Sequence, residues 1–171
     1  MRNEMTLESG RLELRRWREE DADALSRYAS DPLVSELAMW PTHTSRDMSL
    51  YVIREIFMPN PYTLAMVLKE TSEPIGCIGL VPQGDEHYPP ATAEREVGYW
   101  IGRRYWNAGL TTEALEAFIS FCRDGLRFKS LLITTDARNM ASQRVALKCG
   151  FRFIEDYDCD GILSKAFRLT L

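Results

Sequence analysis

The segment from residue 96 to residue 123 constrains the fold of this chain more than any other. Residues 96–101, EVGYWI, form a nearly continuous apolar stretch that predicts a buried strand. Residues 109–123 predict a helix whose inward face carries Leu115, Phe118, Ile119 and Cys122. The first N–H groups of a helix have no partner within it and carry partial positive charge. A strand joined to a helix by a tight turn is therefore suited to an anion such as a phosphate.

The turn itself contains small residues. Gly109 has no Cβ, so it can let a ligand approach the backbone or adopt a positive φ, and Ala108 is nearly as small. Thr111 and Thr112 add hydroxyl donors. The same residues are consistent with a tight strand-to-helix connection that binds nothing, so the local sequence leaves both interpretations open.

Two stretches carry a resemblance to a known family: REVGYWIGRRYWNAGLTTEAL at residues 95–115 and NMASQRVALKCGF at residues 139–151. Together they resemble the GCN5-related N-acetyltransferase (GNAT) superfamily, and within it the ribosomal-protein N-terminal, or RimJ/RimL-like, branch. Further similarity lies in RLELRRWREEDADAL at residues 11–25 and PTHTS at residues 41–45. The likeness extends over nearly the whole chain.

The resemblance implies acetyl-CoA as the acetyl donor, coenzyme A as the product, and no metal. The family's loop reads Gln/Arg-x-x-Gly-x-Gly/Ala, which Arg104 and Gly109 match at its two ends, while Asn107 replaces the first glycine. Asparagine tolerates the left-handed backbone better than other non-glycine residues, so the loop can keep its shape. The implied cofactor-binding residues are Trp100, Ile101, Arg104, Trp106, Asn107, Ala108, Gly109, Leu110, Thr111 and Asn139, with Lys148 and Arg103 as weaker candidates for phosphate contacts.

Acetyl transfer to a primary amine requires that the ammonium lose a proton, because its solution pKa is about 10. Glu96, on the strand that leads into the loop, is the candidate base, acting through a water, and the alternative is an ion pair with Arg95 or another surface charge. Many GNAT members place a tyrosine in the last helix to assist the departing thiolate, but the matching position here is Ala146. Ser142, which matches a serine of the RimJ/RimL-like pattern, is the candidate donor, and the alternative is a helix cap.

The acceptor amine is the α-amine of a protein N-terminus or a small-molecule amine. Met39 and Trp40 are candidates for an apolar wall over the amine, or else core residues. His43 and His87 are the only histidines, both in expected loops, and either can act as a base near neutral pH. The exposed, proline-bearing loop at residues 82–93 is of the kind that shapes substrate entry.

The fold class expected is α/β (α+β), with the GNAT fold implied by the resemblance: a mixed, mostly antiparallel sheet of about seven strands, helices on both faces, and a splayed parallel strand pair at the cofactor site. The periodicity predicts strands at residues 11–17, 62–68, 75–81, 96–101, 131–135, 151–154 and 162–169. Helices are predicted at residues 21–30, from Thr44 or Ser45 to Ile56, at residues 109–123 and at residues 139–148. Pro32 is expected to close the first of these helices.

The composition agrees with one enzyme domain spanning residues 1–171, with 45% hydrophobic and 27% charged residues. A net charge of -4 argues against a nucleic-acid-binding surface. No apolar run approaches membrane-spanning length, and the N-terminus has no apolar signal core, so we expect a cytoplasmic protein. The four cysteines show no metal-ligand spacing, and we expect reduced thiols. A monomer or a homodimer is expected. A catalytically weak acyl-CoA-binding regulatory protein is the alternative that Asn107 and Ala146 suggest.

Overall fold

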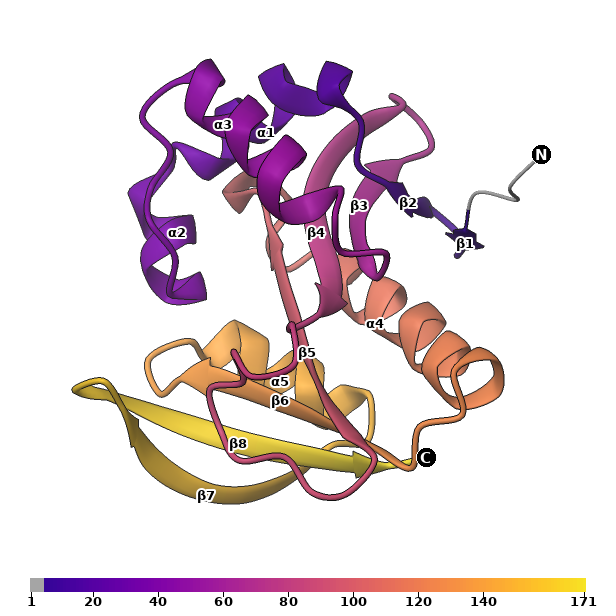
Figure 1. The fold of residues 1–171 in the computed structure, drawn as a ribbon, viewed down its shortest axis with the longest axis vertical. Coiled ribbons are helices and arrows are strands. Elements are labelled where there is room, and N and C mark those ends of the chain that lie inside the picture. Colours follow the sequence, from indigo (N-terminus) through magenta and orange to yellow (C-terminus); the bar gives the residue numbers. More distant parts are fainter. Residues whose placement is uncertain (1–4) are drawn as a thin grey trace.

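One sheet runs through the part of the chain that the computed structural model describes, residues 5–171. Its eight strands follow the order β1-β2-β3-β4-β5-β6-β8-β7, and every neighbouring pair is antiparallel except β5 with β6. The strands are β1 (Thr6–Glu8), β2 (Leu12–Arg16), β3 (Thr63–Leu68), β4 (Glu73–Leu80), β5 (Glu94–Ile101), β6 (Ser130–Asp136), β7 (Arg152–Cys159) and β8 (Ile162–Thr170). Figure 1 shows β5 crossing between the two halves of the sheet.

Helices cover both faces of the sheet. They are α1 (Ala22–Ala29), α2 (Pro32–Ala38), α3 (Arg46–Val52), α4 (Leu110–Ser120) and α5 (Met140–Lys148), and π-helical turns at Ile53–Phe57 and Phe121–Gly125 extend α3 and α4. Short 3₁₀ turns at Glu19–Asp21 and Arg103–Tyr105 precede α1 and follow β5. In Figure 1, α1, α2 and α3 gather at one end of the molecule, while α4 and α5 lie beside β4, β5 and β6.

The alternation of side chains along β3 divides the core into two clusters. Leu64 and Met66 pack with Leu115 and Phe118 of α4, which confirms the inward face predicted for that helix. Ala65 and Val67 point to the other face and pack with Leu25 of α1 and its neighbours. Strand β3 is therefore covered on both faces by helices from different parts of the chain.

The parallel pair splays as the family resemblance implies. Strands β5 and β6 are paired only at Glu94–Ser130, Arg95–Leu131 and Glu96–Leu132. Beyond Glu96, β5 pairs with β4 alone, and beyond Leu132, β6 pairs with β8 alone. The edge of β5 from Val97 onward is consequently free of a sheet neighbour, and this opening positions the site described below.

Three local features differ from the sequence expectations. Strand β1 adds an eighth strand, and its three residues are too few for periodicity to detect. Helix α2 was not predicted: Pro32 was expected only to close the first helix, but it also occupies the first turn of α2, where its missing N–H costs nothing and Asp31 caps Leu33 N. Strand β7 extends to Cys159 rather than ending at residue 154, because it pairs with β8 along its length.

The expected caps and cysteine states agree with the structure. Ser45 caps α3 by accepting from Met48 N at 3.1 Å, and Asn139 caps α5 by accepting from Ser142 N at 3.1 Å. All four cysteines are free thiols, two of them buried. Within residues 5–171, no helix is both long enough and apolar enough to cross a membrane. Residues 1–4, the start of the segment that lacks an apolar signal core, lie outside the described residues.

Candidate active site

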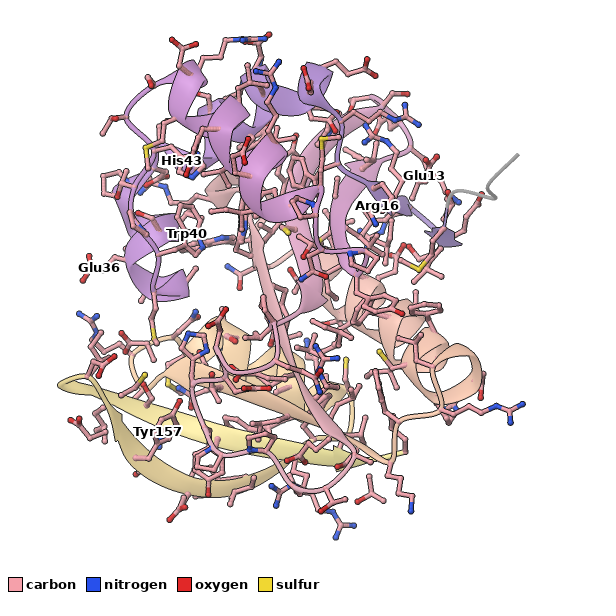
Figure 2. All side chains as sticks on the ribbon, in the orientation of Figure 1. Glu13, Arg16, Glu36, Trp40, His43 and Tyr157 are labelled. Atoms are coloured by element: carbon pink, nitrogen blue, oxygen red, sulfur yellow. The ribbon has the colours of Figure 1, made fainter. Side chains whose placement is uncertain are left out.

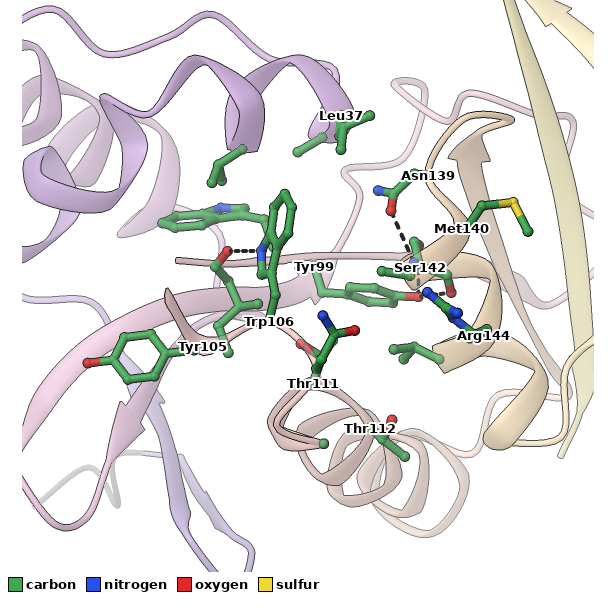
Figure 3. Close-up of a pocket in the computed structure, with 18 of the residues that line it drawn as sticks. Leu37, Tyr99, Tyr105, Trp106, Thr111, Thr112, Asn139, Met140, Ser142 and Arg144 are labelled. Atoms are coloured by element: carbon green, nitrogen blue, oxygen red, sulfur yellow. Dashed lines mark hydrogen bonds between the residues drawn. The ribbon is translucent and has the colours of Figure 1, made fainter. Parts of the chain in front are cut away.

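A cavity of about 550 Å³ opens where β5 and β6 separate, with α2, α4 and α5 around it. We call it the splay cavity (Figure 3). Seven of the residues predicted to bind the cofactor line it: Trp100, Ile101, Trp106, Asn107, Gly109, Thr111 and Asn139. The splay thus brings together residues of β5, the following turn, and the N-termini of α4 and α5.

The turn after β5 has the backbone that its sequence suggested. Asn107 and Gly109 both have left-handed φ values, 61° and 77°. Asn107 therefore adopts the conformation that a glycine would otherwise supply, as expected for asparagine. A side chain at Gly109 would meet the strain of positive φ as well as the Arg11 guanidinium, 3.5 Å from an ideal Cβ.

Arg11 fastens this turn to the rest of the molecule. Its Nη1 donates to the Ala108 carbonyl at 3.0 Å, and its Nε lies 2.9 Å from the Glu113 carboxylate in the first turn of α4. The indole Nε1 of Trp106 donates to the Ile101 carbonyl at 3.0 Å (Figure 3). These contacts fix the loop in the absence of a ligand. Binding therefore costs little conformational entropy for ordering the loop.

Three of the predicted cofactor residues do not line the splay cavity. The Leu110 side chain is buried in the core under α4, and Ala108 contributes its carbonyl to the Arg11 contact. Arg104 is exposed and stacks over the ring of Tyr105, 5.3 Å from its centroid. Arg103, a weaker candidate, pairs with Asp31 at 2.9 Å, whereas Lys148 does line the cavity.

Several lining residues were not singled out from the sequence. Leu37 comes from the unpredicted helix α2, so its position depended on tertiary packing. Tyr99, Tyr105, Met140 and Arg144 also line the cavity (Figure 3). Arg144 was detectable in principle, because it lies one helical turn before the candidate Lys148 on α5 and shares its face. Together with Lys148, it adds positive charge to the α5 wall.

Tyr99 and Ser142 form a hydroxyl pair on the cavity wall. The Tyr99 Oη lies 3.1 Å from the Ser142 Oγ and donates to the Ser142 carbonyl at 3.1 Å (Figure 3). Burial raises the pKa of the Tyr99 phenol, so it stays protonated at neutral pH. Position 146, where the resemblance led us to look for a tyrosine, is a fully buried alanine. A phenol is nevertheless present, and it projects from β5 instead of from α5.

A second cavity, of about 710 Å³, lies against the opposite face of β4 and β5. We call it the apolar cavity: its floor includes Gly79 and Gly98, and α1, α3 and the segment after α2 form its walls. Met39 and Trp40, the predicted acceptor residues, both line it, and Trp40 also packs on the smaller core cluster. Figure 2 shows Trp40 and His43 on the connection between α2 and α3.

The apolar residues of the helix predicted after Ser45 line this cavity, and Val52 also packs on the smaller core cluster. Met48, Tyr51, Val52 and Ile56 are all wall residues, and Tyr51 and Ile56 are 62% and 53% exposed. The residues of this segment that the fold buries are Ser49 and Ile53. An apolar face at helical spacing is therefore presented to a cavity, which sequence periodicity cannot distinguish from a core face.

The two cavities meet at β5. Tyr99, Trp100 and Ala38 line both of them. The Trp100 ring also packs edge-on against Trp40, with centroids 5.4 Å apart. A group bound in the splay cavity and a group bound in the apolar cavity can therefore approach each other beside Tyr99 and Trp100, which line both cavities.

Glu96 lies behind the wall of the apolar cavity, and it binds His87, not Arg95. Its side chain is only 2% exposed and accepts from the His87 backbone N at 2.8 Å and from the Thr134 hydroxyl at 2.6 Å. The His87 Nδ1 lies 2.8 Å from the Glu96 Oε1. The hydrogen bond to Glu96 raises the pKa of the His87 imidazole, and His87 itself lines the cavity. The sequence singled out each residue without indicating that they pair.

The other histidine has a structural partner. His43 is buried, its Nδ1 lies 2.8 Å from the Ser49 hydroxyl, and its backbone N donates to the Ala29 carbonyl at 3.0 Å. Burial lowers its pKa, so it remains neutral at neutral pH. It contributes to the wall of the apolar cavity as an uncharged ring.

Comparison with known proteins places this architecture in a family. Residues 11–152 match the acetyltransferase (GNAT) domain. The chain is 28% identical over 161 residues to the uncharacterised N-acetyltransferase p20 of Bacillus licheniformis, covering 90% of this chain and 87% of that protein. The chain therefore belongs to the GNAT acetyltransferase family, and the resemblance to the GNAT superfamily noted in the sequence is confirmed.

Solved structures agree on the fold. RimL, a ribosomal L7/L12 alpha-N-protein acetyltransferase, superposes with a TM-score of 0.78 at 17% identity, covering 98% of this chain and 95% of that one. The microcin C7 self-immunity acetyltransferase MccE, in complex with acetyl-CoA and AMP, superposes with a TM-score of 0.79 at 18% identity, covering 95% and 93% of the two chains. At these identities, the similarity concerns the fold alone.

Proposed function

We propose that this protein transfers the acetyl group of acetyl-CoA directly to a primary amine. The observation that carries the proposal is the meeting of two cavities at Tyr99 and Trp100 on β5. One cavity is suited to the acetyl donor and the other to the amine. The same proposal includes a single cytoplasmic domain over residues 1–171, monomeric or dimeric, related to the RimJ/RimL-like branch.

The backbone and charges that line the splay cavity support a coenzyme A donor. The left-handed backbone at Asn107 and Gly109 and the start of α4 direct N–H groups at a site suited to a pyrophosphate. Arg144 and Lys148, on the α5 wall, can neutralise further phosphate charge. The unpaired edge of β5 beyond Glu96 offers backbone groups to an amide-bearing chain.

The donor supplies a thioester: the amine nitrogen bonds to the acetyl carbon, the carbon–sulfur bond breaks, and the thiol of coenzyme A leaves. We propose that His87 takes the proton from the amine and that Glu96 positions it. An ionised carboxylate only accepts hydrogen bonds, so Nδ1 carries the hydrogen and the neutral ring keeps its lone pair on Nε2. Glu96, enclosed by His87 and Thr134, acts through the imidazole.

The Tyr99–Ser142 pair is the proposed proton donor to the leaving sulfur. Ser142, the candidate from the sequence, shares its hydroxyl with the Tyr99 phenol at 3.1 Å, so a proton given up by one can be replaced through the other. The raised pKa of Tyr99 keeps it a donor at neutral pH. The His87–Glu96 pair and the Tyr99–Ser142 pair lie on opposite sides of β5. Their presence favours an enzyme that turns over its substrates, and not a regulatory protein that only binds acyl-CoA.

Isothermal titration with acetyl-CoA, followed by thiol release with a panel of amines, tests the proposal. Coenzyme A and ATP serve as titration controls. We expect binding of the two CoA compounds that ATP does not reproduce, and amine-dependent release of free thiol. Binding without release across the panel would favour the regulatory protein, and an absence of binding would remove the splay cavity from the mechanism.

A further inference from the structure

The apolar cavity has a composition that restricts which amine it can hold. Its walls carry large apolar side chains, among them Trp40, Tyr51, Ile56 and Phe57. The single carboxylate among its lining residues is Asp85, on the loop that also carries His87. The apolar groups therefore dominate the surface that an acceptor meets, and Asp85 and His87 lie together on the loop after β4.

Two wall residues of the apolar cavity have large, exposed side chains. Tyr51 and Ile56, on α3 and its π-helical extension, leave more than half of their surface in water. Contact with hydrocarbon would remove that surface from water at a gain of about 25 cal/mol per Å². Exposed apolar groups around a concave surface indicate a ligand with an apolar body.

The floor of the cavity leaves room for that body. Gly79 of β4 and Gly98 of β5 are paired across the two strands, so no side chain rises from either position. A Cβ at Gly98 would approach only the Val81 side chain, at 3.8 Å. The space above Gly98 is therefore open to a ligand.

The same cavity is unsuited to the other amines that GNAT chemistry could use. A peptide carries an N–H and a carbonyl at nearly every residue, and burying them without partners is costly. The cavity lies on the face of β4 and β5, where β4 has its backbone paired on both sides. Asn60, a polar wall residue, already donates to Leu80 and accepts from Tyr62. A polyamine would bring several charges to one carboxylate.

From these contacts we infer that the apolar cavity binds a small primary amine carried on an aromatic or branched hydrocarbon body. The inference rests on the proposed acetyl transfer and names its acceptor. The hydrocarbon body contacts Tyr51, Ile56 and Trp40, while the amino group lies on the side of His87, toward Trp100 and the splay cavity. Apolar surroundings also favour the neutral amine, which is the form that attacks the thioester.

The first test compares acceptors by thiol release at saturating acetyl-CoA. The panel contains 2-phenylethylamine, spermidine and a tetrapeptide with a free N-terminus. We expect kcat/KM for 2-phenylethylamine to exceed both of the others by at least tenfold. A preference for the peptide or for spermidine would overturn the inference while leaving acetyl transfer intact.

The second test measures the cavity without the donor. Trp40 and Trp100 line it, so titration with 2-phenylethylamine should change the intrinsic tryptophan fluorescence saturably. A protein that binds acetyl-CoA but shows neither this change nor turnover of 2-phenylethylamine would overturn the inference alone. Saturable binding of the amine by a protein that does not bind acetyl-CoA would instead overturn the proposed function and support the cavity assignment.

Two variants link the preference to the cavity. Gly98→Leu fills the floor and should raise KM for 2-phenylethylamine at least tenfold, with the affinity for acetyl-CoA unchanged. Tyr51→Ala removes a 62% exposed wall residue, so folding is not at risk, and should raise KM severalfold. Leu163→Ala is the matched control, because Leu163 is 58% exposed on β8 and lines neither cavity. Equal KM in Tyr51→Ala and Leu163→Ala would contradict the inference.

Discussion

The imidazole Nδ1 of His87 lies 2.8 Å from the Oε1 of Glu96, joining the loop over the acceptor side to the strand that forms its floor. This contact converts two separate titratable residues into one proton-accepting unit. Glu96 is buried and held by three donors, whereas the His87 side chain is 40% exposed and lines the apolar cavity. The pair therefore presents the imidazole, not the carboxylate, to a bound amine.

The pH dependence of turnover should follow the His87 imidazole. The contact with Glu96 raises its pKa above the ordinary value, so only above that raised pKa is the ring neutral and able to accept a proton. We expect kcat to rise with pH through this value. His87→Gln should remove the rising limb and lower kcat by about 10²–10⁴-fold. The control variant His43→Gln should retain the rise of kcat with pH. If His87→Gln also retains this rise, His87 is excluded as the base.

Removing the charge of Glu96 distinguishes a positioning residue from the base itself. In Glu96→Gln the imidazole loses its anionic partner, so its pKa falls and the rising limb of the pH profile should move to lower pH. We expect kcat to decrease while the affinity for acetyl-CoA, measured by calorimetry, stays the same. Loss of the limb in this variant, together with a normal profile in His87→Gln, would make Glu96 the base, acting through water.

The hydroxyl pair on the cavity wall should act as a unit. Tyr99→Phe removes the phenol that lies 3.1 Å from the Ser142 hydroxyl, and Ser142→Ala removes its partner. Each change should reduce kcat by about 10–100-fold with little effect on the affinity for acetyl-CoA, and the double variant should lose much less than the product of the two. Single-turnover kinetics measures the chemical step. Strictly multiplicative losses would show that the hydroxyls act independently.

The left-handed turn is the point at which the donor site is most easily blocked. Gly109→Trp combines the strain of φ at 77° with a large ring at the mouth of the splay cavity, and it should reduce acetyl-CoA affinity below detection in calorimetry. Gly161→Trp is the control, since Gly161 has a φ of 85°, has open space around its Cβ position and lies on the turn between β7 and β8. Both variants share the backbone strain. Equal affinities of the two variants for acetyl-CoA would therefore show that the turn at Gly109 does not take part in donor binding.

A buried ion pair close to the first helix should matter for stability instead of catalysis. Arg15 contacts Asp21 through both terminal nitrogens, at 2.8 and 2.9 Å, and Asp21 also accepts from Arg18 N at 2.9 Å. Asp21→Ala leaves a buried guanidinium without its partner and should cost about 3–5 kcal/mol in the free energy of unfolding measured by urea titration. Asp23→Ala, which breaks the exposed pair with Arg46, should cost less than about 1 kcal/mol.

Much of the donor side could be read from the sequence, because the signals there are local. The apolar run before Gly102, the small residues at 108 and 109, and Asn139 before a helical pattern each depend on a few consecutive residues. Backbone preference decides such features: Asn107 takes a left-handed conformation because it tolerates that conformation best. Arg104 shows the limit, since a position that matches the family motif has its side chain over Tyr105 and outside the cavity.

The acceptor side was decided by tertiary structure. Periodicity predicts that Val52 and Ile56, one helical turn apart, share a helix face, but whether a core or a cavity receives that face depends on the packing of α1 and α3 against the sheet. Likewise, Glu96 and His87 are both visible in the sequence, yet their contact exists because the loop after β4 folds back over β5. The sequence by itself determined seven of the eight strands and the donor loop, since these follow from local propensity and spacing, and its resemblance to the GNAT superfamily implied the sheet that the strands form. The pairing of proton-transferring groups and the shape of the acceptor cavity required the chain to bring distant segments together.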